Sequence, residues 1–144
     1  MLFFCRHGET MHNRKKIKQG RFPSLLTLKG IDQAKSMAYK ILDHEKNFEN
    51  YKLISSPMVR TRHTMQIIQE VLGISDKQVI LEELINERDA GDFTNIPKEL
   101  INKNFPEFVE KKGKASCYAY KPLKAGIIAT MFIMFHRKIS IYII

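Results

Sequence analysis

The chain has 144 residues, 44% of them hydrophobic and 27% charged, which is typical of one globular domain and excludes a disordered, collagen-like or disulfide-stapled chain. Its two cysteines, Cys5 and Cys117, are too few for a disulfide framework, and no Cys/His cluster has zinc-ligand spacing. The formal net charge of +9 fits nucleic acid, an anionic membrane or a small phosphorylated substrate. Because the basic residues are spread along the chain without an RNA-binding aromatic motif, we expect no nucleic-acid partner.

The first elements expected along the chain are a buried strand and an amphipathic helix. Leu2–Cys5 is a short apolar run that ends at Arg6, as expected of a strand that delivers polar residues at its carboxyl end. After Thr27, a suitable N-cap, apolar residues recur at three- and four-residue spacing and predict a helix. The apolar face of that helix comprises Leu28, Ile31, Ala34, Met37, Ala38, Ile41 and Leu42.

A second strand and a second helix are expected next. Lys52–Ser55 has the pattern of a strand, and Ser56 followed by Pro57 indicates an N-cap with proline at the first helical position. We expect this helix to run to about Leu72 and to stop at Gly73 by a left-handed cap. Its apolar side is expected to comprise Val59, Ile67, Ile68, Val71 and Leu72.

The following segments complete an α/β pattern. Gln78–Leu81 reads as a third strand, 86–95 as a polar loop, and 97–112 as a helix interrupted at Pro106. Strands that alternate with helices predict an α/β fold, a three-layer sandwich with a mostly parallel sheet flanked by helices. No internal repeat or low-complexity linker divides the chain.

The last part of the chain differs in composition. Every Asp and Glu lies at or before Glu110, whereas 123–144 contains three basic residues and no acid. The apolar run 125–135 has eleven residues, fewer than the roughly 20 that a membrane helix needs. We therefore expect a buried strand or helix in this run and no membrane partner.

The segment Arg6-His7-Gly8-Glu9-Thr10 stands at the carboxyl end of the first strand, where α/β sheets bind ligands. A neutral imidazole nitrogen can attack phosphorus and form a covalent intermediate, and a guanidinium group can hold the phosphoryl oxygens. These residues make His7 a candidate nucleophile and Arg6 a candidate phosphate clamp. The alternative is a simple turn after a strand, with Gly8 supplying backbone freedom.

This segment resembles the RHGE(T) motif of the histidine phosphatase branch of the phosphoglycerate mutase-like superfamily. The segment 54–64, ISSPMVRTRHT, is similar to the family's SSPLxRAxQTA and places Arg60 near a helix start, where the helix N-terminus also favours phosphate. The alternative for Arg60 is an ordinary solvated helix face. The segment 84–91 is similar to the one in which a Glu four residues before a Gly donates a proton. The resemblance thus identifies Glu87 as acid/base, although from the residues alone Glu82 and Glu83 are equal candidates.

A fourth similarity covers Gln19-Gly20 and 25–34, which resemble the family's QG…PLTxxGxxQA. It implies that Asn13, Gln19 and Gly20 border the phosphate, with loop structure and helix capping as the alternative. The resemblance also implies a phosphoglycerate mutase-like fold, His7 as nucleophile, clamps at Arg6 and Arg60, and neither metal nor cofactor.

The resemblance ends near Pro122. The family's second catalytic His, which follows a later apolar strand, has only His136 as a weak candidate, because Arg137 and Lys138 replace the glycines that follow it in the family. Tyr118–Pro122 resembles the start of the family's YKPPGGES, and the residues after Pro122 abandon the pattern. We therefore expect a histidine phosphatase-like domain over 1–122, an atypical apolar basic tail over 123–144, and a fold that is incomplete at its C-terminus. The hypothesis for this change is a shifted reading frame or another disruption of a longer ancestral chain.

The function expected from these features is hydrolysis of a small phosphomonoester through a phosphohistidine. The cysteine usage and an apolar N-terminal stretch of only four residues before Arg6 favour a cytoplasmic protein. Two alternatives stay open. One is a phosphoglycerate mutase, for which the chain is short, and the other is a catalytically impaired remnant that only binds phosphate because the second His is missing.

Overall fold

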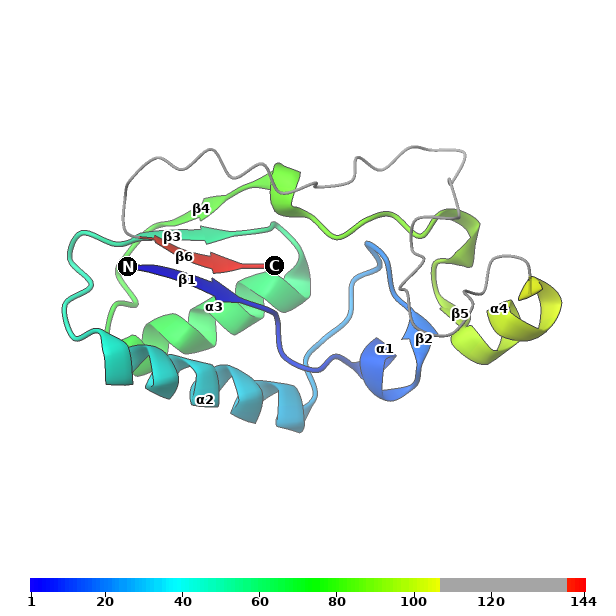
Figure 1. The fold of residues 1–144 in the computed structure, drawn as a ribbon, viewed down its shortest axis with the longest axis horizontal. Helices are drawn as coiled ribbons and strands as arrows, with labels where there is room; N and C mark the ends of the chain where they lie inside the picture. The colour runs from blue at the N-terminus through cyan, green and yellow to red at the C-terminus, as the bar shows by residue number, and fades with distance from the viewer. Residues whose placement is uncertain (107–139) are drawn as a thin grey trace.

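A parallel four-stranded sheet forms the centre of the protein in a computed structural model, which describes residues 1–106 and 140–144. The strands β1 (Leu2–Cys5), β6 (Ser140–Ile143), β3 (Lys52–Ser55) and β4 (Val79–Leu81) lie in the order β1-β6-β3-β4 and are parallel at every pairing. All four arrows in Figure 1 point toward the edge of the sheet where α1 and β2 lie. The carboxyl ends of β1 and β3 therefore open on the same side.

Two helices, α2 (Leu28–His44) and α3 (Val59–Leu72), pack against each other on one face of this sheet (Figure 1). The alternation of side chains along the strands turns one set of residues toward the helices, and these residues share one apolar core with both helices. That core includes Cys5, Ala38, Ile41, Leu53, Met65, Ile68, Ile141 and Ile143. The predicted α/β fold with a parallel sheet is confirmed, and in the described residues α2 and α3 cover one face of that sheet.

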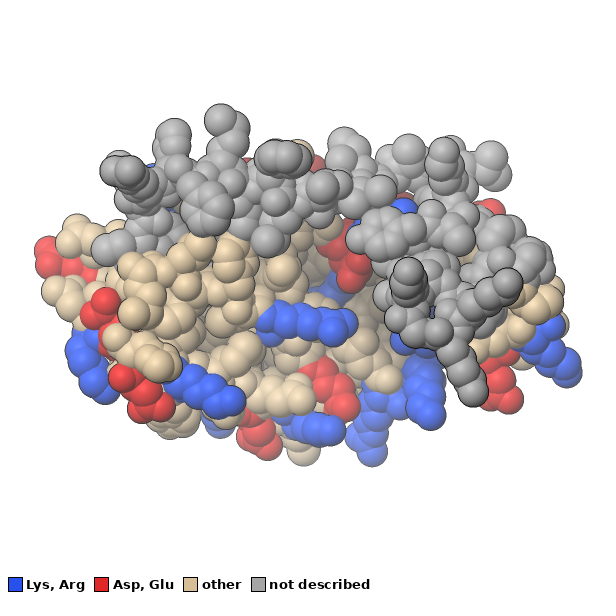
Figure 2. Space-filling view, viewed as in Figure 1, with Lys and Arg blue, Asp and Glu red and all other residues tan. Residues whose placement is uncertain are grey.

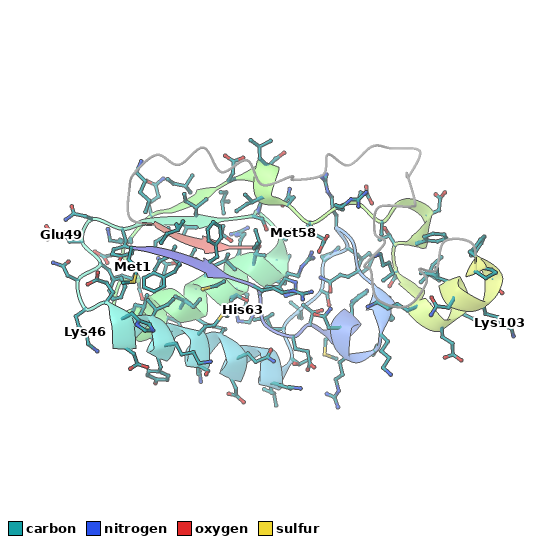
Figure 3. All side chains as sticks on the ribbon, in the orientation of Figure 1. Met1, Lys46, Glu49, Met58, His63 and Lys103 are labelled. Atoms are coloured by element: carbon teal, nitrogen blue, oxygen red, sulfur yellow. The ribbon has the colours of Figure 1, made fainter. Side chains whose placement is uncertain are left out.

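A smaller unit stands beyond the carboxyl ends of the strands. It contains α1 (Met11–Arg14), a two-stranded antiparallel ribbon of β2 (Ile17–Lys18) and β5 (Ile96–Pro97), and α4 (Lys98–Asn104). Two 3-10 turns, η1 (Glu83–Ile85) and η2 (Gly91–Phe93), lead from β4 into this unit. Met58 lies at the end of the sheet that faces the unit, Glu49 lies at the opposite end, and Lys103 lies at the far end of α4 (Figure 3).

The ends of the two long helices test the capping predictions. Thr27 caps α2 as expected, because its side chain accepts from the Gly30 N–H, and Gly73 ends α3 in the left-handed conformation at φ 69°. The start of α3 differs from the prediction: the N-cap is Met58, and Ser56 and Pro57 lie before the helix. The Ser56 hydroxyl is 2.9 Å from the hydroxyl of Thr61, so it is engaged with the first turn without capping it.

The predicted apolar faces are partly wrong at the helix starts. Leu28 is 82% exposed and Val59 is 42% exposed, and each is the first residue of its helix. Within α3 the buried side also includes Met65 and the polar Thr61 and Thr64, which the apolar pattern did not indicate. Periodicity locates the face of a helix that packs, but not the point along the axis where packing begins.

The remaining predicted segments are partly described. The third strand is confirmed as β4, and within 97–112 the described helix is α4, which ends at Asn104 before Pro106. The apolar run 125–135 and His136 lie outside the described residues, whereas β6 was not predicted from the sequence. The family boundary expected at Pro122 stays a prediction, and β6 shows that part of the expected tail belongs to the main sheet. No helix in the described ranges is long and apolar enough to cross a membrane.

Candidate active site

His7 stands directly beyond β1 at the edge of the sheet. Its main-chain N–H donates to the Ile144 carbonyl at 2.9 Å, and its half-buried ring places Nδ1 2.7 Å from the Gly8 carbonyl oxygen. A carbonyl oxygen only accepts hydrogen bonds, so Nδ1 must carry the proton. In the neutral ring Nε2 is then the nitrogen with the lone pair, and it is the atom able to act as a nucleophile.

Burial lowers the pKa of His7 from its ordinary value of 6.5. The hydrogen bond to the Gly8 carbonyl opposes this effect, the charges of Arg60 and Arg6 lower the pKa further, and the charge of Glu87 raises it. The imidazole is therefore held in its neutral, nucleophilic form near pH 7. Arg6, Arg60 and Glu87 therefore lie within electrostatic range of the His7 ring.

The segment after His7 is packed tightly against both long helices. A Cβ atom at Gly8 would clash with the main-chain oxygen of Gly30, and a Cβ at Gly30 would clash with the oxygen of Glu9. The Gly8 N–H donates to the hydroxyl of Thr64 at 3.2 Å, and that hydroxyl donates to the Arg60 carbonyl at 2.8 Å. The similarity over 25–34 thus has a structural basis, since the first turn of α2 fixes the segment that carries His7.

Arg60 is in the first turn of α3 and is only 2% exposed. Its Nη2 donates to the Gly20 carbonyl at 3.0 Å, and its Nη1 and Nε donate to the Gln19 side-chain oxygen at 2.6 and 3.0 Å when the amide has the orientation that satisfies both of its ends. A buried charge is tolerated where such partners surround it. Burial lowers the pKa of Arg60, Glu87 raises it and Arg6 lowers it, yet a guanidinium stays protonated in a protein.

Thr10 connects the His7 segment to this arginine. It is fully buried, and its hydroxyl accepts from the Gln19 amide nitrogen at 2.6 Å and donates to Asn13 Oδ1 at 3.0 Å. Thr10 and Asn13 also form a capping box at the start of α1. Asn13 is exposed, and its described contacts belong to this cap, which favours the capping alternative for that residue.

Glu87 is an exposed residue in the segment between η1 and η2. Its Oε1 accepts from the Arg88 N–H at 2.9 Å, and its main-chain carbonyl accepts from Arg21 Nε at 3.2 Å. Arg21 follows Gly20, whose φ of +51° lets the turn at 19–22 pass against Ala90. The turn therefore contacts the Arg60 side chain on one side and the Glu87 segment on the other.

The structure brings Arg6, Arg60 and Glu87 close enough for their charges to act on His7, and Gln19 and Gly20 hydrogen-bond to the Arg60 side chain. Gly20 contacts Arg60 through its carbonyl oxygen, whereas Gly20 was expected to lie next to the phosphate. Sequence reasoning missed the roles of Thr10 and Thr64. Both are polar residues within the recognised motifs, and their complete burial was the property that the motifs did not reveal.

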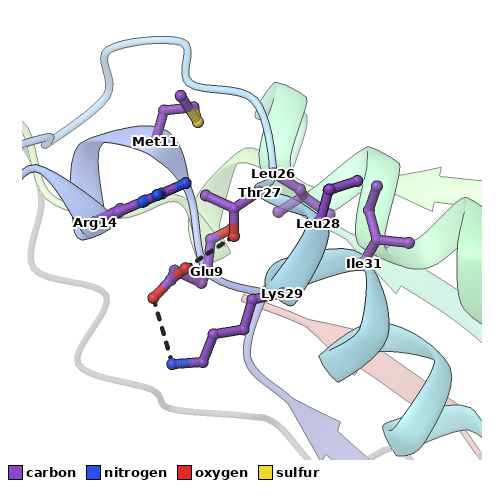
Figure 4. Close-up of a pocket in the computed structure, with 8 residues that line it drawn as sticks. All are labelled: Glu9, Met11, Arg14, Leu26, Thr27, Leu28, Lys29 and Ile31. Carbon is purple, nitrogen blue, oxygen red and sulfur yellow. Dashed lines mark hydrogen bonds and ion pairs between the residues drawn. The ribbon is translucent and has the colours of Figure 1, made fainter.

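A pocket of about 500 Å³ lies between the segment that follows His7 and the start of α2, and Figure 4 shows it. Glu9 points into it beside Lys29, with 3.7 Å between the carboxylate and the ammonium group, and the Thr27 hydroxyl donates to Glu9 at 2.8 Å. The lining does not include His7. In the described ranges, no group of three or more His, Cys, Asp or Glu side chains is placed to hold a metal ion.

Basic side chains gather around the unit beyond the sheet. Figure 2 shows Lys and Arg over α1 and β2 on the visible face, and Arg14, Lys15 and Lys16 are exposed there. These charges extend the positive field of Arg6 and Arg60 toward the solvent. A field of this sign favours the approach of anions, with a strength that falls as salt is added.

The fold and the site together define an α/β protein of the phosphoglycerate mutase-like type, with a histidine at the carboxyl edge of a parallel sheet. The chain belongs to the histidine phosphatase superfamily (branch 1), whose family model matches residues 2–125.

Individual relatives include both mutases and phosphatases. A 2,3-bisphosphoglycerate-dependent phosphoglycerate mutase from Afipia carboxidovorans is 33% identical over 107 residues, which make up 74% of this chain and 51% of that protein. The alpha-ribazole phosphatase from Shigella flexneri has a TM-score of 0.61 at 27% identity, over 74% of this chain and 50% of its own. Phosphoglycerate mutase from Bacillus anthracis has a TM-score of 0.63 at 22% identity, over 71% and 43%, a likeness of fold. The chain spans about half the length of the curated relatives it matches.

Proposed function

We propose that this protein hydrolyses a small phosphomonoester by transferring the phosphoryl group to His7 and then to water. The observation that carries the proposal is the hydrogen bond of 2.7 Å between Nδ1 of His7 and the Gly8 carbonyl. This bond fixes Nε2 as the free nitrogen at a place where two arginines supply positive charge. Membership of the histidine phosphatase superfamily supports the same reaction class.

In the first step the Nε2 lone pair attacks phosphorus, an N–P bond forms and the P–O bond to the alcohol breaks. Glu87 is proposed to give its proton to the leaving oxygen. In the second step Glu87 takes a proton from water, the resulting hydroxide attacks phosphorus, and the N–P bond breaks to release inorganic phosphate. One carboxyl group can serve as acid and then as base because its protonation state alternates between the two steps.

The positive groups of the site would act mainly on the transition state. Negative charge spreads over the equatorial phosphoryl oxygens during transfer, and donors fixed in advance around those oxygens lower the barrier. Arg60 is the better fixed of the two arginines, because it is buried and held by Gln19 and Gly20. Arg6 is exposed and is proposed to complete the clamp when an ester binds.

A cytoplasmic location is part of the proposal, and the free, buried thiol of Cys5 is compatible with it.

A phosphoglycerate mutase is the second candidate, favoured by the relatives that carry this name. A phosphate-binding remnant without turnover is the third, favoured by Arg137 and Lys138, which follow His136 where the family has glycines. The three functions predict different outcomes for the same purified protein. A mutase interconverts phosphoglycerates faster than it releases phosphate, and a remnant binds phosphate without turning over an ester.

The test compares wild type with His7→Ala, using p-nitrophenyl phosphate and 3-phosphoglycerate as substrates. We expect wild type to release phosphate from p-nitrophenyl phosphate and His7→Ala to lose this activity, with no effect of EDTA. Equal rates for the two proteins would exclude the proposal that this protein is an enzyme acting through His7. Faster isomerisation of 3-phosphoglycerate than phosphate release would establish the mutase instead.

A further inference from the structure

We propose that Gln19 is a positioning residue that orients the Arg60 guanidinium, and that it acts on the substrate only through that arginine. The inference rests on the proposed function, in which Arg60 holds the phosphoryl group. It differs from the expectation that Gln19 itself borders the phosphate. A buried chain of hydrogen bonds runs from Thr10 through Gln19 to Arg60.

Gln19 and Arg60 are both buried, at 8% and 2% exposure. The Gln19 oxygen accepts from Nη1 and Nε of Arg60, and the Gly20 carbonyl accepts from Nη2. These contacts use Nε–H and one hydrogen on each terminal nitrogen. Within the described ranges, the second hydrogen on each terminal nitrogen is left for a ligand, so the fork presents a fixed pair of donors suited to two phosphoryl oxygens.

The other end of the Gln19 amide explains why an amide fits this position. The single hydroxyl hydrogen of Thr10 is directed at Asn13 Oδ1 at 3.0 Å, so this hydroxyl can only accept from a further partner. The amide nitrogen of Gln19 supplies that hydrogen at 2.6 Å. Glutamine can donate to Thr10 and accept from Arg60 at once, whereas a carboxylate could only accept.

This chain of hydrogen bonds fixes Arg60 relative to His7. Thr10 lies three residues after His7, and Arg60 is in a different element, so Gln19 joins the nucleophile segment to the phosphate donor. Without the Gln19 oxygen as acceptor, the Arg60 side chain would keep its charge. Its guanidinium plane would no longer be held in one orientation. Donors that must reorganise during the reaction stabilise the transition state less than donors already in place.

The principal variant is Gln19→Met, which keeps the size of the side chain and removes both polar ends. We expect kcat for p-nitrophenyl phosphate to fall roughly 10–100-fold, a part of the 10²–10³-fold that loss of a whole donor costs, and KM to rise because the same donors bind the phosphate of the ester. The matched control is Gln69→Met. Gln69 is also 8% exposed, and its amide binds main-chain carbonyls of Ile74 and Lys77. The control should lower stability and leave kcat unchanged.

A double-variant cycle distinguishes positioning from direct contact with the substrate. If Gln19 acts through Arg60, Gln19→Met should change kcat by less than about twofold in an Arg60→Ala background. A full Gln19→Met effect in that background would overturn the inference. Gln19→Glu should restore part of the activity, because a carboxylate oxygen can still accept from the guanidinium.

A readout without turnover separates this inference from the proposed function. In ¹H–¹⁵N spectra the Nε–H of Arg60 should be protected from exchange in wild type and in Gln69→Met, and exposed to exchange in Gln19→Met. Inorganic phosphate should bind Gln19→Met about tenfold more weakly by calorimetry. Unchanged protection and affinity would overturn the inference even in an active enzyme. Absence of turnover in wild type would defeat only the proposed function. Should Gln19→Met fail to fold, Gln19→Asn removes the same contact by shortening the side chain, with the same expected losses.

Discussion

The hydroxyl of Thr64 gives a prediction about how the His7 segment is held to α3. This side chain is completely buried, and its oxygen accepts from the Gly8 N–H at 3.2 Å and donates to the Arg60 carbonyl at 2.8 Å. Thr64→Val keeps the shape and removes the hydroxyl, so the Gly8 N–H loses its acceptor. An unsatisfied buried polar group costs about 1–3 kcal/mol. We expect the free energy of unfolding in urea to fall by that amount, and the melting temperature by roughly 2–4 °C for each kcal/mol.

Thr94→Val is the matched control. The Thr94 hydroxyl is buried and has no hydrogen-bond partner among the described residues, so replacing it with a methyl group removes no interaction. We expect this change to shift the free energy of unfolding by less than about 0.5 kcal/mol, or to raise it slightly. Equal losses for the two variants would refute the reasoning, because the cost would then come from the hydroxyl-to-methyl change itself and not from the Gly8 contact.

Three further results are expected. The His7 imidazole should titrate below pH 6.5 in an NMR titration, because burial lowers its pKa. The value of kcat/KM should fall as the pH drops through this pKa, because the protonated ring cannot attack phosphorus. A titration midpoint above pH 6.5 would contradict this prediction. Arg21→Ala releases the carbonyl of Glu87, so kcat should fall by up to about 10²-fold without a large change in melting temperature. Gly8→Ala should prevent stable folding, whereas Gly73→Ala has open space and should cost only about 1 kcal/mol of strain; similar melting temperatures for both would be inconsistent with the packing described.

The sequence predicted where His7 and Arg60 lie in the fold better than it predicted what surrounds them. His7 was expected after a strand, and the resemblance of 54–64 to a family motif placed Arg60 near a helix start; both positions are observed. The role of Gln19 as a partner of Arg60 was not accessible in this way. That contact joins residues 41 positions apart, and it depends on a turn whose geometry the motif does not specify.

The sheet shows the same limit. β6 contributes the strand between β1 and β3, and its place follows from pairing with partners far away in the chain. Local pattern in 140–143 contains a short apolar run without the turn residues that normally bound a strand. Likewise, the spacing of apolar residues included Leu28 in the core face of α2, although this first residue of the helix is exposed. Local signals fix element type, and tertiary contacts decide strand order and burial.

The most direct test of the account is to look for the phosphohistidine. The protein would be incubated with p-nitrophenyl phosphate, quenched under non-acidic conditions and examined by mass spectrometry and ³¹P NMR, with His7→Ala alongside. We predict one phosphoryl group on Nε2 of His7 and none in the variant. A His7 ring that stays unmodified while wild type still releases phosphate would contradict the proposed mechanism.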